Sequence, residues 1–325
     1  MDLFSIVIPT YKGEDSLAVA LESLARQTYE NIEVIVSDDN GKDTADQLRT
    51  EAVVDSFKDR LNIVYLPNEH VNGSHARNEG LKVAKGLYIA LLDDDDFYLS
   101  DHVEKAVQAF GETDADMVFF SVAILTREGA QRIIRNKEIN AKDLLYYRKE
   151  IGSGSNLCFR RRVYDEDGGF DERYLRSQDI EFAVKKLNRY KSVWIDEIKI
   201  VKYFNRTDNF PDYRKSLDNY ELLCKDMCES GIISEKGRDE LYLNRLHSFY
   251  NDLLAKGAPK DDIKAVYALL KDKGSLSFRD KGMMAVYVIS KPLFEMIFKA
   301  YLSMSKNEDT SKELLELRKE LEVRR

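Results

Sequence analysis

Apolar positions over the first two hundred residues follow two alternating patterns. Short β-rich, mostly apolar runs predict buried strands, and apolar residues three or four apart, as at Leu17, Leu21 and Leu24, predict helices that cover them. The runs span residues 4–8, 32–36, 62–66 and 87–92, and further helices are expected to begin near Thr44 and Ser74. This alternation predicts βαβ units and therefore an α/β fold with a mostly parallel sheet flanked by helices.

The pattern changes near Pro211, after which only helical spacing remains. Turn residues separate the helices expected there. These span residues 213–228, 235–254, 261–270 and about 281 to the end. We therefore expect an α/β domain over residues 1–210 and an all-helical C-terminal region over residues 211–325.

Four consecutive aspartates, Asp93 to Asp96, follow the apolar run 87–92 directly. Successive side chains of a strand point to opposite faces, so Asp93 and Asp95 are expected to converge while Asp94 points away. Converging carboxylates repel one another unless a cation neutralises them, and Mg²⁺ or Mn²⁺ holding a phosphate prefers such oxygen ligands. The alternative is a solvated acidic turn in which Asp96 caps the following helix.

Composition and charge narrow the classes of protein. The chain of 325 residues carries a net charge of −8, of which residues 1–210 contribute −9 and residues 211–325 contribute +1. We expect no nucleic-acid partner, because phosphate backbones require a basic surface. An acidic half that binds a phosphate requires a cation.

Cysteine content and apolar run length bear on the compartment. Three cysteines exclude a disulfide scaffold and favour a reducing compartment. The N-terminus lacks the features of a signal peptide, and no apolar run has the length needed to cross a bilayer. We therefore expect a cytoplasmic protein, with peripheral contact at the inner face of the cell membrane left open.

Polar residues follow the expected strands at the point where each strand ends. Ligands of parallel sheets lie at the carboxyl ends of the strands. The first strand ends in Pro9-Thr10-Tyr11 and the second in Asp38-Asp39-Asn40-Gly41. Tyr11 can stack on a base, and Asp39 can accept a hydrogen bond from a base N–H or a ribose hydroxyl, which makes a nucleotide pocket. The alternatives are a packed aromatic at Tyr11 and an ordinary turn at residues 38–41.

Seven short segments together carry a family resemblance. In order and spacing they resemble the family 2 glycosyltransferases with the GT-A (Rossmann-like) fold, and the match covers roughly residues 3–205. The segments are SIVIPTY (5–11), SLARQTY (23–29), EVIVSDD (33–39), ARN (76–78), GLYI (86–89), LDDDD (92–96) and GGFDE (168–172).

The resemblance implies an activity and a partition of residues 1–210. The family transfers a sugar from a nucleotide diphosphate sugar, here expected to be UDP-linked, to a hydroxyl with inversion at the anomeric carbon. A glycan or lipid-linked glycan is the expected acceptor, in surface polysaccharide synthesis. The nucleotide-sugar half is expected at about residues 1–100 and the acceptor half at about 101–210.

The resemblance also implies roles for single residues near the nucleotide. Pro9, Thr10, Tyr11 and Asp39 match the base and ribose contacts. Arg77 matches a contact near the diphosphate, with a plain ion pair as its alternative.

Asp93 and Asp95 match the family's Asp-x-Asp motif, in which the last carboxylate binds Mn²⁺ or Mg²⁺. Asp95 is therefore the expected metal ligand, with Asp93 as a second candidate, and Asp93 and Asp94 are grouped with the nucleotide-sugar contacts. The motif leaves the separate roles of Asp94 and Asp96 open.

The acceptor half is implied to supply the base and further contacts. Asp179 matches the catalytic base of the family, and Gly154, Gln178 and Arg206 are candidate contacts to the diphosphate or acceptor. Gln178 stands where many relatives have Glu. Residues 202–208 lack the histidine that relatives often place there, so Asn205 or Asp208 is left to complete the metal site. The four histidines of the chain are expected on the surface or within helices.

Residues 211–325 allow two interpretations. Phe294, Ile297, Phe298 and Tyr301 form an apolar stripe with lysines beside it. Such a stripe fits either peripheral binding to an anionic membrane or packing within the domain or a homo-oligomer.

Two other classes of function remain as alternatives. One is a non-catalytic subunit that binds a nucleotide sugar and partners another transferase. The other is a Rossmann oxidoreductase, although Lys12-Gly13-Glu14-Asp15 stands where its glycine fingerprint would follow the first strand.

Overall fold

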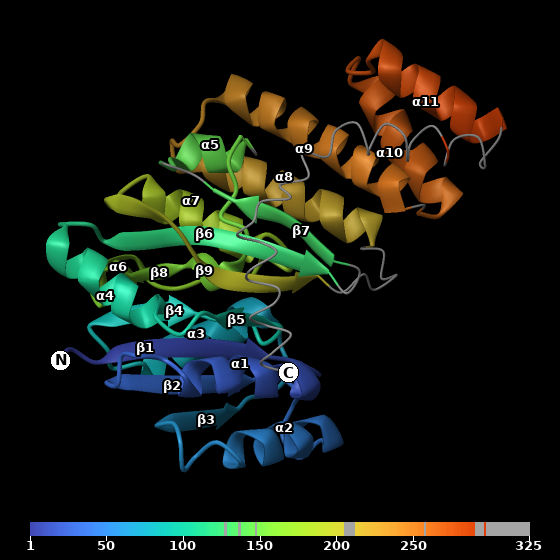
Figure 1. The fold of residues 1–325 in the computed structure, drawn as a ribbon. Coiled ribbons are helices and arrows are strands. Elements are labelled where there is room, and N and C mark those ends of the chain that lie inside the picture. Colours follow the sequence, from blue (N-terminus) through green and yellow to red (C-terminus); the bar gives the residue numbers. More distant parts are fainter. Residues whose placement is uncertain are drawn as a thin grey trace. The chain divides into compact units, whose positions relative to one another are not determined.

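The computed structural model describes residues 1–126, 129–135, 138–146, 148–204, 212–256, 258–289 and 296. These residues divide into two compact units, one within residues 1–206 and the other within residues 207–308 (Figure 1). Each unit is described by itself below.

The first unit begins with four parallel strands in the order β3-β2-β1-β4, which follow one another in Figure 1. The strands are β1 (Phe4–Thr10), β2 (Ile32–Asp38), β3 (Ile63–Pro67) and β4 (Tyr88–Leu91). The helices between them are α1 (Glu14–Ala25), α2 (Ala45–Asp55) and α3 (Gly73–Val83). Every strand and helix predicted for residues 1–92 is confirmed. Thr44 caps α2, because its side chain accepts a hydrogen bond from the Gln47 N–H.

The sheet then changes direction beyond β4. Strand β8 runs antiparallel to both β4 and β6, β6 pairs in parallel with β9, and β5 and β7 are antiparallel partners of β9 and β6. The elements of this part are β5 (Asp96–Tyr98), α4 (His102–Glu112), β6 (Met117–Thr126), β7 (Gly129–Ile134), α5 (Ala141–Leu145), the 3₁₀ helix η1 (Gly154–Asn156), β8 (Cys158–Arg160), α6 (Arg161–Asp167), α7 (Gln178–Leu187) and β9 (Ser192–Phe204). The result is a nine-stranded, mostly parallel sheet within the described residues.

The second unit is helical throughout its described residues, as the sequence pattern predicts. It contains α8 (Tyr213–Glu229), α9 (Glu235–Lys256), α10 (Lys260–Asp272) and α11 (Phe278–Ile289). Residues from α8 to α11 share one apolar core, in which Leu246, Tyr250 and Val266 are fully buried. The apolar stripe at Phe294, Ile297, Phe298 and Tyr301 lies outside the described residues.

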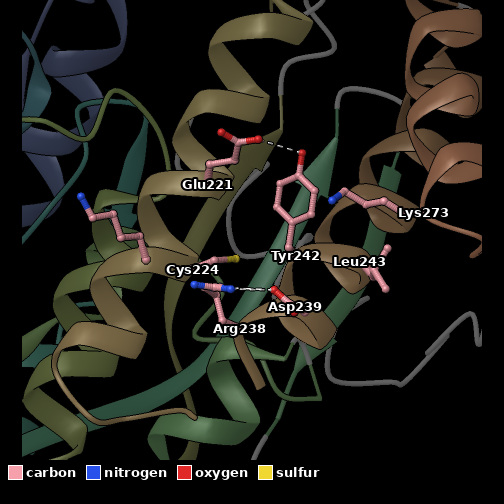
Figure 2. Close-up of a pocket in the computed structure, with 8 residues that line it drawn as sticks. Glu221, Cys224, Arg238, Asp239, Tyr242, Leu243 and Lys273 are labelled. Atoms are coloured by element: carbon pink, nitrogen blue, oxygen red, sulfur yellow. Dashed lines mark hydrogen bonds and ion pairs between the residues drawn. The ribbon is translucent and has the colours of Figure 1, made fainter. Parts of the chain in front are cut away.

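A pocket of about 560 Å³ lies in this helical unit (Figure 2). Its charged groups are paired: the Tyr242 hydroxyl donates to Glu221, Arg238 pairs with Asp239, and the Lys273 ammonium lies 5.0 Å from the Tyr242 ring centroid. No residue assigned to the nucleotide site from sequence lines this pocket. Across the described part of the chain, no helix combines the length and the apolar character that spanning a membrane requires.

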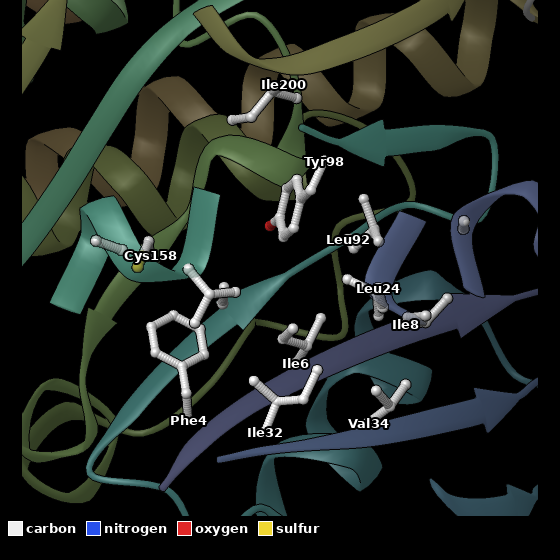
Figure 3. Close-up of a cluster of buried hydrophobic side chains, with 14 of the residues drawn as sticks. Phe4, Ile6, Ile8, Leu24, Ile32, Val34, Leu92, Tyr98, Cys158 and Ile200 are labelled. Carbon is white, nitrogen blue, oxygen red and sulfur yellow. The ribbon is translucent and has the colours of Figure 1, made fainter. Parts of the chain in front are cut away.

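The main core of the first unit lies where strands meet helices α1 and α4. Figure 3 shows part of this cluster, including Phe4, Ile6 and Leu24. Apolar residues of β1 such as Phe4, Ile6 and Ile8 are fully buried. Tyr98 is also buried, and its hydroxyl lies 2.5 Å from the Leu91 carbonyl oxygen and 2.8 Å from that of Ser155. The Tyr98 hydroxyl therefore lies between the end of β4 and η1.

Helix α3 packs closely on β1 because residue 80 has no side chain. A Cβ atom on Gly80 would lie 2.3 Å from Val7 Cγ1, closer than two carbon atoms can approach. The contact fixes the distance of α3 from the sheet, and α3 carries residues of the pocket described below.

We predict that Gly80→Ala lowers the free energy of unfolding by about 1–3 kcal/mol, because Val7 or the helix must move. Gly111→Ala in α4 is the matched control: a Cβ there meets nothing within 4 Å, so alanine should stabilise the helix by about 0.5–1 kcal/mol. Urea unfolding of both variants measures the difference. Equal stability of the two variants would contradict close packing of α3 on β1.

Candidate functional site

A pocket of about 320 Å³ lies at the carboxyl ends of β1, β2 and β4, beside the start of α3. The structure brings together eight of the residues assigned from sequence: Pro9, Thr10, Tyr11, Asp39, Arg77, Asp93, Asp94 and Asp95. Four further residues complete the lining: His70, Asn72, Gly73 and Ala76. The topology explains this convergence, because parallel strands end at the same edge of the sheet.

Tyr11, His70 and Asp39 form one end of the pocket. The rings of Tyr11 and His70 stack with centroids 4.5 Å apart, and Tyr11 is 46% exposed. The Asp39 carboxylate is buried, with Oδ1 accepting the Val71 N–H and Oδ2 lying 2.9 Å from His70 Nδ1. Tyr11 is therefore an exposed aromatic and not a core residue. From the sequence we expected His70 on the surface or within a helix, and its place in this pocket was not predicted.

The aspartate run does not alternate as the sequence suggested. Strand β4 ends at Leu91, and Asp94 and Asp95 form a turn, so the two-residue period of a strand no longer applies. The expectation that Asp94 points away is therefore wrong: it lines the pocket, and its Oδ2 accepts the Thr10 hydroxyl at 2.6 Å. A Cβ on Gly13 would lie 2.1 Å from the same oxygen, so a side chain at position 13 would displace the Asp94 carboxylate.

Asp96 is the first residue of β5 and does not line the pocket. Its Oδ2 accepts the hydroxyls of Ser153 at 2.5 Å and Ser155 at 2.7 Å, and the residue is 1% exposed. The alternative in which Asp96 caps a helix is wrong, because α4 begins only at His102. Asp96 pairs in register with Lys202 of β9.

Two cations offset the acidic run. Arg77 Nη2 donates to Asp93 Oδ1 at 2.6 Å, and Arg77 Nη1 donates to the Gly73 carbonyl at 3.1 Å. Burial by itself raises the pKa of Asp93, but the charges of Arg77 and then Lys202 outweigh it and hold that pKa below its ordinary value. Among the described residues, Arg77 Nε is buried and has no hydrogen-bond partner.

The other three carboxylates have raised pKa values. Burial, with repulsion from neighbouring aspartates, raises the pKa of Asp94 to about 7. Burial also raises the pKa of Asp96 to about 7, although Lys202 acts in the opposite direction. For Asp95, loss of hydration in the pocket and the charge of Asp93 raise the pKa. An added cation would favour the ionised forms.

The residues present fit a divalent cation held jointly with a ligand. No three His, Cys, Asp or Glu side chains in the described ranges are arranged to hold a metal by themselves. Mg²⁺ is commonly bound through one or two carboxylates together with phosphate oxygens and water. Asp95 is exposed in the pocket, whereas Asp93 is already bound by Arg77 and Ser153. Asp95 is therefore the better placed ligand.

The residues assigned to the acceptor half lie close to Asp93 and Arg77. A Cβ on Gly154 would lie 3.3 Å from Asp93 Oδ2, and Gln178 Nε2 lies 4.0 Å from the Cβ position of Gly73. Asp179 is half-buried in the first turn of α7 and does not line the pocket. Burial, and then the charge of Asp93, raise its pKa, while Arg77 acts in the opposite direction. Arg206, Asn205 and Asp208 lie outside the described residues.

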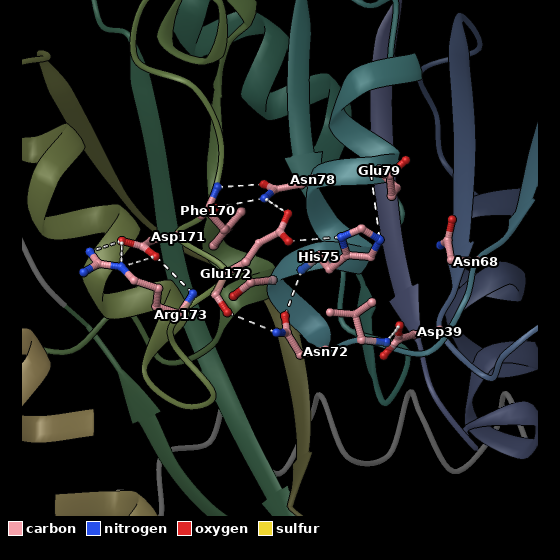
Figure 4. Close-up of polar contacts among 12 residues, drawn as sticks. Asp39, Asn68, Asn72, His75, Asn78, Glu79, Phe170, Asp171, Glu172 and Arg173 are labelled. Atoms are coloured by element: carbon pink, nitrogen blue, oxygen red, sulfur yellow. Dashed lines mark hydrogen bonds and ion pairs between the residues drawn. The ribbon is translucent and has the colours of Figure 1, made fainter. Parts of the chain in front are cut away.

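A set of hydrogen bonds ties α3 to the loop that precedes α7 (Figure 4). Asn78 Nδ2 donates to the Phe170 carbonyl and to Glu172, and Asn78 Oδ1 accepts the Phe170 N–H at 2.7 Å. His75 Nδ1 lies 3.1 Å from Glu172 Oε2, and Asn72 Nδ2 donates to the Glu172 carbonyl. The contacts explain why the segment 168–172 has a glycine at position 169: a Cβ there would lie 2.2 Å from Asn78 Oδ1.

Sequence reasoning missed Lys202, Ser153 and Ser155 as partners of the aspartate run. Their contacts depend on the pairing of β5 with β9 and on the position of η1, and neither has a local pattern. The one sequence signal for Lys202 was that it lies in residues 202–208, where relatives often have a histidine near the metal.

Comparison with protein families gives a match to the family described as Glycosyl transferase family 2, over residues 5–168. An uncharacterized glycosyltransferase of Rickettsia bellii is 28% identical over 263 residues, which are 76% of this chain. The Escherichia coli UDP-Glc:alpha-D-GlcNAc-diphosphoundecaprenol beta-1,3-glucosyltransferase WfaP is 38% identical over 122 residues, or 37% of the chain. The amylovoran biosynthesis glycosyltransferase AmsB of Erwinia amylovora is 28% identical over 194 residues, or 56% of the chain. The matches span 37%, 45% and 63% of the lengths of these three relatives, less than two thirds of each.

Two solved structures share the fold. Staphylococcus aureus TarS 1-349 in complex with UDP-GlcNAc has a TM-score of 0.64 and 17% identity, covering 94% of this chain and 92% of that one. The mannosyltransferase PcManGT from Pyrobaculum calidifontis, in complex with GDP-Man and Mn²⁺, has a TM-score of 0.52 and 16% identity, covering 95% of this chain and 88% of that one.

We predict that Asn78→Ala lowers the free energy of unfolding by about 1–3 kcal/mol, because the backbone N–H and carbonyl of buried Phe170 lose their partner. His75→Ala is the matched control on the same helix face. It removes a contact to Glu172, whose side chain is 42% exposed, so the loss should be about 0–1 kcal/mol. Urea unfolding distinguishes the two, and a larger loss for His75→Ala would refute the ranking.

Proposed function

This chain belongs to glycosyl transferase family 2 and is a glycosyltransferase, and from that premise we propose its donor, its metal and its base. The donor is a nucleotide diphosphate sugar, UDP-linked, and the acceptor is a hydroxyl of a glycan or lipid-linked glycan. The transfer inverts the anomeric carbon, depends on Mn²⁺ or Mg²⁺ and serves surface polysaccharide synthesis. One observation carries the proposal: a single pocket joins Tyr11 and Asp39 at one end to Arg77 and the aspartate run.

The base end of the pocket supports uracil. Tyr11 offers an exposed ring for stacking, and an ionised Asp39 accepts hydrogen bonds only. The ring N–H on the pairing edge of uracil or guanine is a donor that Asp39 can accept. The names of two similar proteins favour uracil, since WfaP is named for UDP-Glc and TarS 1-349 is described in complex with UDP-GlcNAc.

The start of α3 supports a diphosphate subsite. Asn72, Gly73 and Ala76 line the pocket at the N-terminus of α3, where backbone dipoles favour an anion. Arg77, which also lines the pocket, adds a positive charge. Asp95, with Asp93 beside it, would hold the metal, which when bound supplies positive charge to the diphosphate leaving group.

Asp179 is proposed as the general base for the acceptor hydroxyl. Its raised pKa makes it a stronger proton acceptor than an exposed aspartate, which suits removal of a proton from an alcohol. Asp179 lies outside the pocket, but the charges of Asp93 and Arg77 act on it, which supports a position beside the proposed diphosphate subsite. A base on the opposite side of the sugar from the leaving group gives inversion in one displacement. Gly154 and Gln178 border this region and are proposed contacts to the diphosphate or acceptor.

The names of two relatives support a proposal for the acceptor and for the location of the protein. WfaP is named for a diphosphoundecaprenol-linked acceptor and AmsB for amylovoran biosynthesis, which supports a lipid-linked glycan in polysaccharide synthesis. A lipid-linked acceptor would bring this protein to the inner face of the cell membrane.

The first test of the site concerns Asp95. Asp95→Asn should lower release of UDP from a panel of UDP-sugars by about a hundredfold or more, because charge stabilisation of the leaving group is lost. Electron paramagnetic resonance of Mn²⁺ should show weak binding without UDP and stronger binding with it in the wild type only. Asp59→Asn, an exposed aspartate, is the control. Full activity of Asp95→Asn, or of the wild type in excess chelator, would refute metal dependence at this residue.

The second test concerns Asp179. Asp179→Asn keeps the shape of the side chain and removes its basicity, so kcat should fall about 10²- to 10⁴-fold. The Kd for UDP should stay within about twofold, because the group acts in the transition state and not in nucleotide binding. Asp171→Asn, which removes an ion pair with Arg173, should retain activity. If Asp179→Asn keeps activity within a few-fold of wild type and Asp171→Asn or Glu181→Gln loses it, the base lies at one of those residues.

A further inference from the structure

The end of the pocket assigned to the nucleobase already holds a side chain of the protein. The His70 ring stacks on Tyr11 with centroids 4.5 Å apart and planes 13° from parallel. The same ring places Nδ1 2.9 Å from Asp39 Oδ2. His70 therefore contacts both residues that the proposed function assigns to the base.

The hydrogen-bond partners of His70 Nδ1 determine whether this nitrogen carries a hydrogen. Nδ1 lies 2.9 Å from Asp39 Oδ2 and 2.9 Å from the Asp39 carbonyl oxygen, and both atoms are acceptors. Nδ1 must therefore carry a hydrogen. The imidazole then presents a flat face to Tyr11 and an N–H to Asp39, the two features that uracil or guanine would present.

Burial shows that a base cannot simply be added to this arrangement. The Asp39 side chain is only 4% exposed, and its other oxygen accepts the Val71 N–H. The His70 side chain is 50% exposed and belongs to the segment between β3 and α3. A base reaches the Asp39 oxygen only if His70 leaves it, and His70 is exposed enough to move away from that oxygen.

We propose that His70 is a displaceable occupant of the nucleobase subsite, which the base of the donor replaces on Tyr11 and Asp39. The inference rests on the nucleotide site proposed above. Binding of the base is then an exchange in which one stacked ring and one hydrogen bond are lost as another pair is gained. The affinity for the nucleotide is lower than the same contacts would give in a vacant subsite.

The test compares nucleotide binding by the full chain with and without the ring. The Kd for UDP and for GDP, each with Mn²⁺, is measured by isothermal titration calorimetry for the wild type and His70→Ala. We expect His70→Ala to bind the preferred nucleotide about three- to tenfold more tightly, as loss of one hydrogen bond and one ring contact implies. Inorganic diphosphate with Mn²⁺, which has no base, should bind both proteins equally.

Two further variants separate the contributions. His70→Phe keeps a ring for Tyr11 but cannot donate to Asp39, so its gain in affinity should be smaller than that of His70→Ala. Glu69→Ala changes the preceding residue, whose side chain is 74% exposed, and should leave the affinity unchanged. A gain in Glu69→Ala equal to that in His70→Ala would attribute the effect to loosening of the segment and overturn the proposal.

Two other outcomes would overturn either the displacement of His70 or the proposed nucleotide site. Weaker or unchanged nucleotide binding by His70→Ala, with diphosphate binding unaltered, would show that His70 stays in place and overturn its displacement. A wild type that binds neither nucleotide nor diphosphate would instead overturn the proposed nucleotide site.

A measurement on the wild type avoids dependence on the fold of a variant. The chain has four histidines, so NMR of ¹³C-labelled histidine can follow the His70 ring, identified by its absence in His70→Phe. The ring-current shift that Tyr11 imposes on His70 should disappear when the nucleotide saturates the site. A shift that persists at saturation would overturn the proposal.

Discussion

Repulsion among four consecutive carboxylates is the constraint on which this site depends. Asp93 to Asp95 lie between β4 and β5, Asp96 is the first residue of β5, and each carboxylate has a different environment. Asp93 binds Arg77, Asp94 accepts the Thr10 hydroxyl, and Asp96 is held by Ser153 and Ser155 beside Lys202. Asp95 is the member of the run that is exposed in the pocket. The arrangement concentrates negative charge while leaving one carboxylate accessible to a ligand.

The parallel half of the fold was predictable because its signals are local. Mostly apolar runs such as Phe4 to Ile8 identify strands buried on both faces, and Thr44 marks the start of α2 by capping it. Strand β9 carries charged residues such as Asp196, Glu197 and Lys199, and β5 has only three residues. Their strand conformation depends on pairing with partners distant in sequence, which no local period reveals.

Part of the candidate site was likewise predictable from sequence, and part was not. Pro9, Thr10, Tyr11, Asp39 and Asp95 could be assigned because they follow strands whose ends meet at one edge of the sheet, and because they match motifs of the family. The direction of Asp94 was predicted wrongly because strand β4 stops at Leu91, before the period that oriented it could apply. Lys202 and His70 were missed because register and ring stacking, which only the folded chain defines, place them near Asp96 and Tyr11.

Helix α3 carries two consecutive residues with separate duties: Arg77 meets Asp93, and Asn78 meets the loop at Phe170. Consecutive residues of a helix are rotated by about 100° from each other, so both contacts hold at only one rotation of α3 about its axis. Gly80 against Val7 fixes how closely the helix approaches the sheet. One residue inserted in α3 ahead of Arg77 would turn both side chains away together. Insertions and deletions that surface loops of such a protein tolerate would therefore disrupt both contacts if they fell in α3 ahead of Arg77.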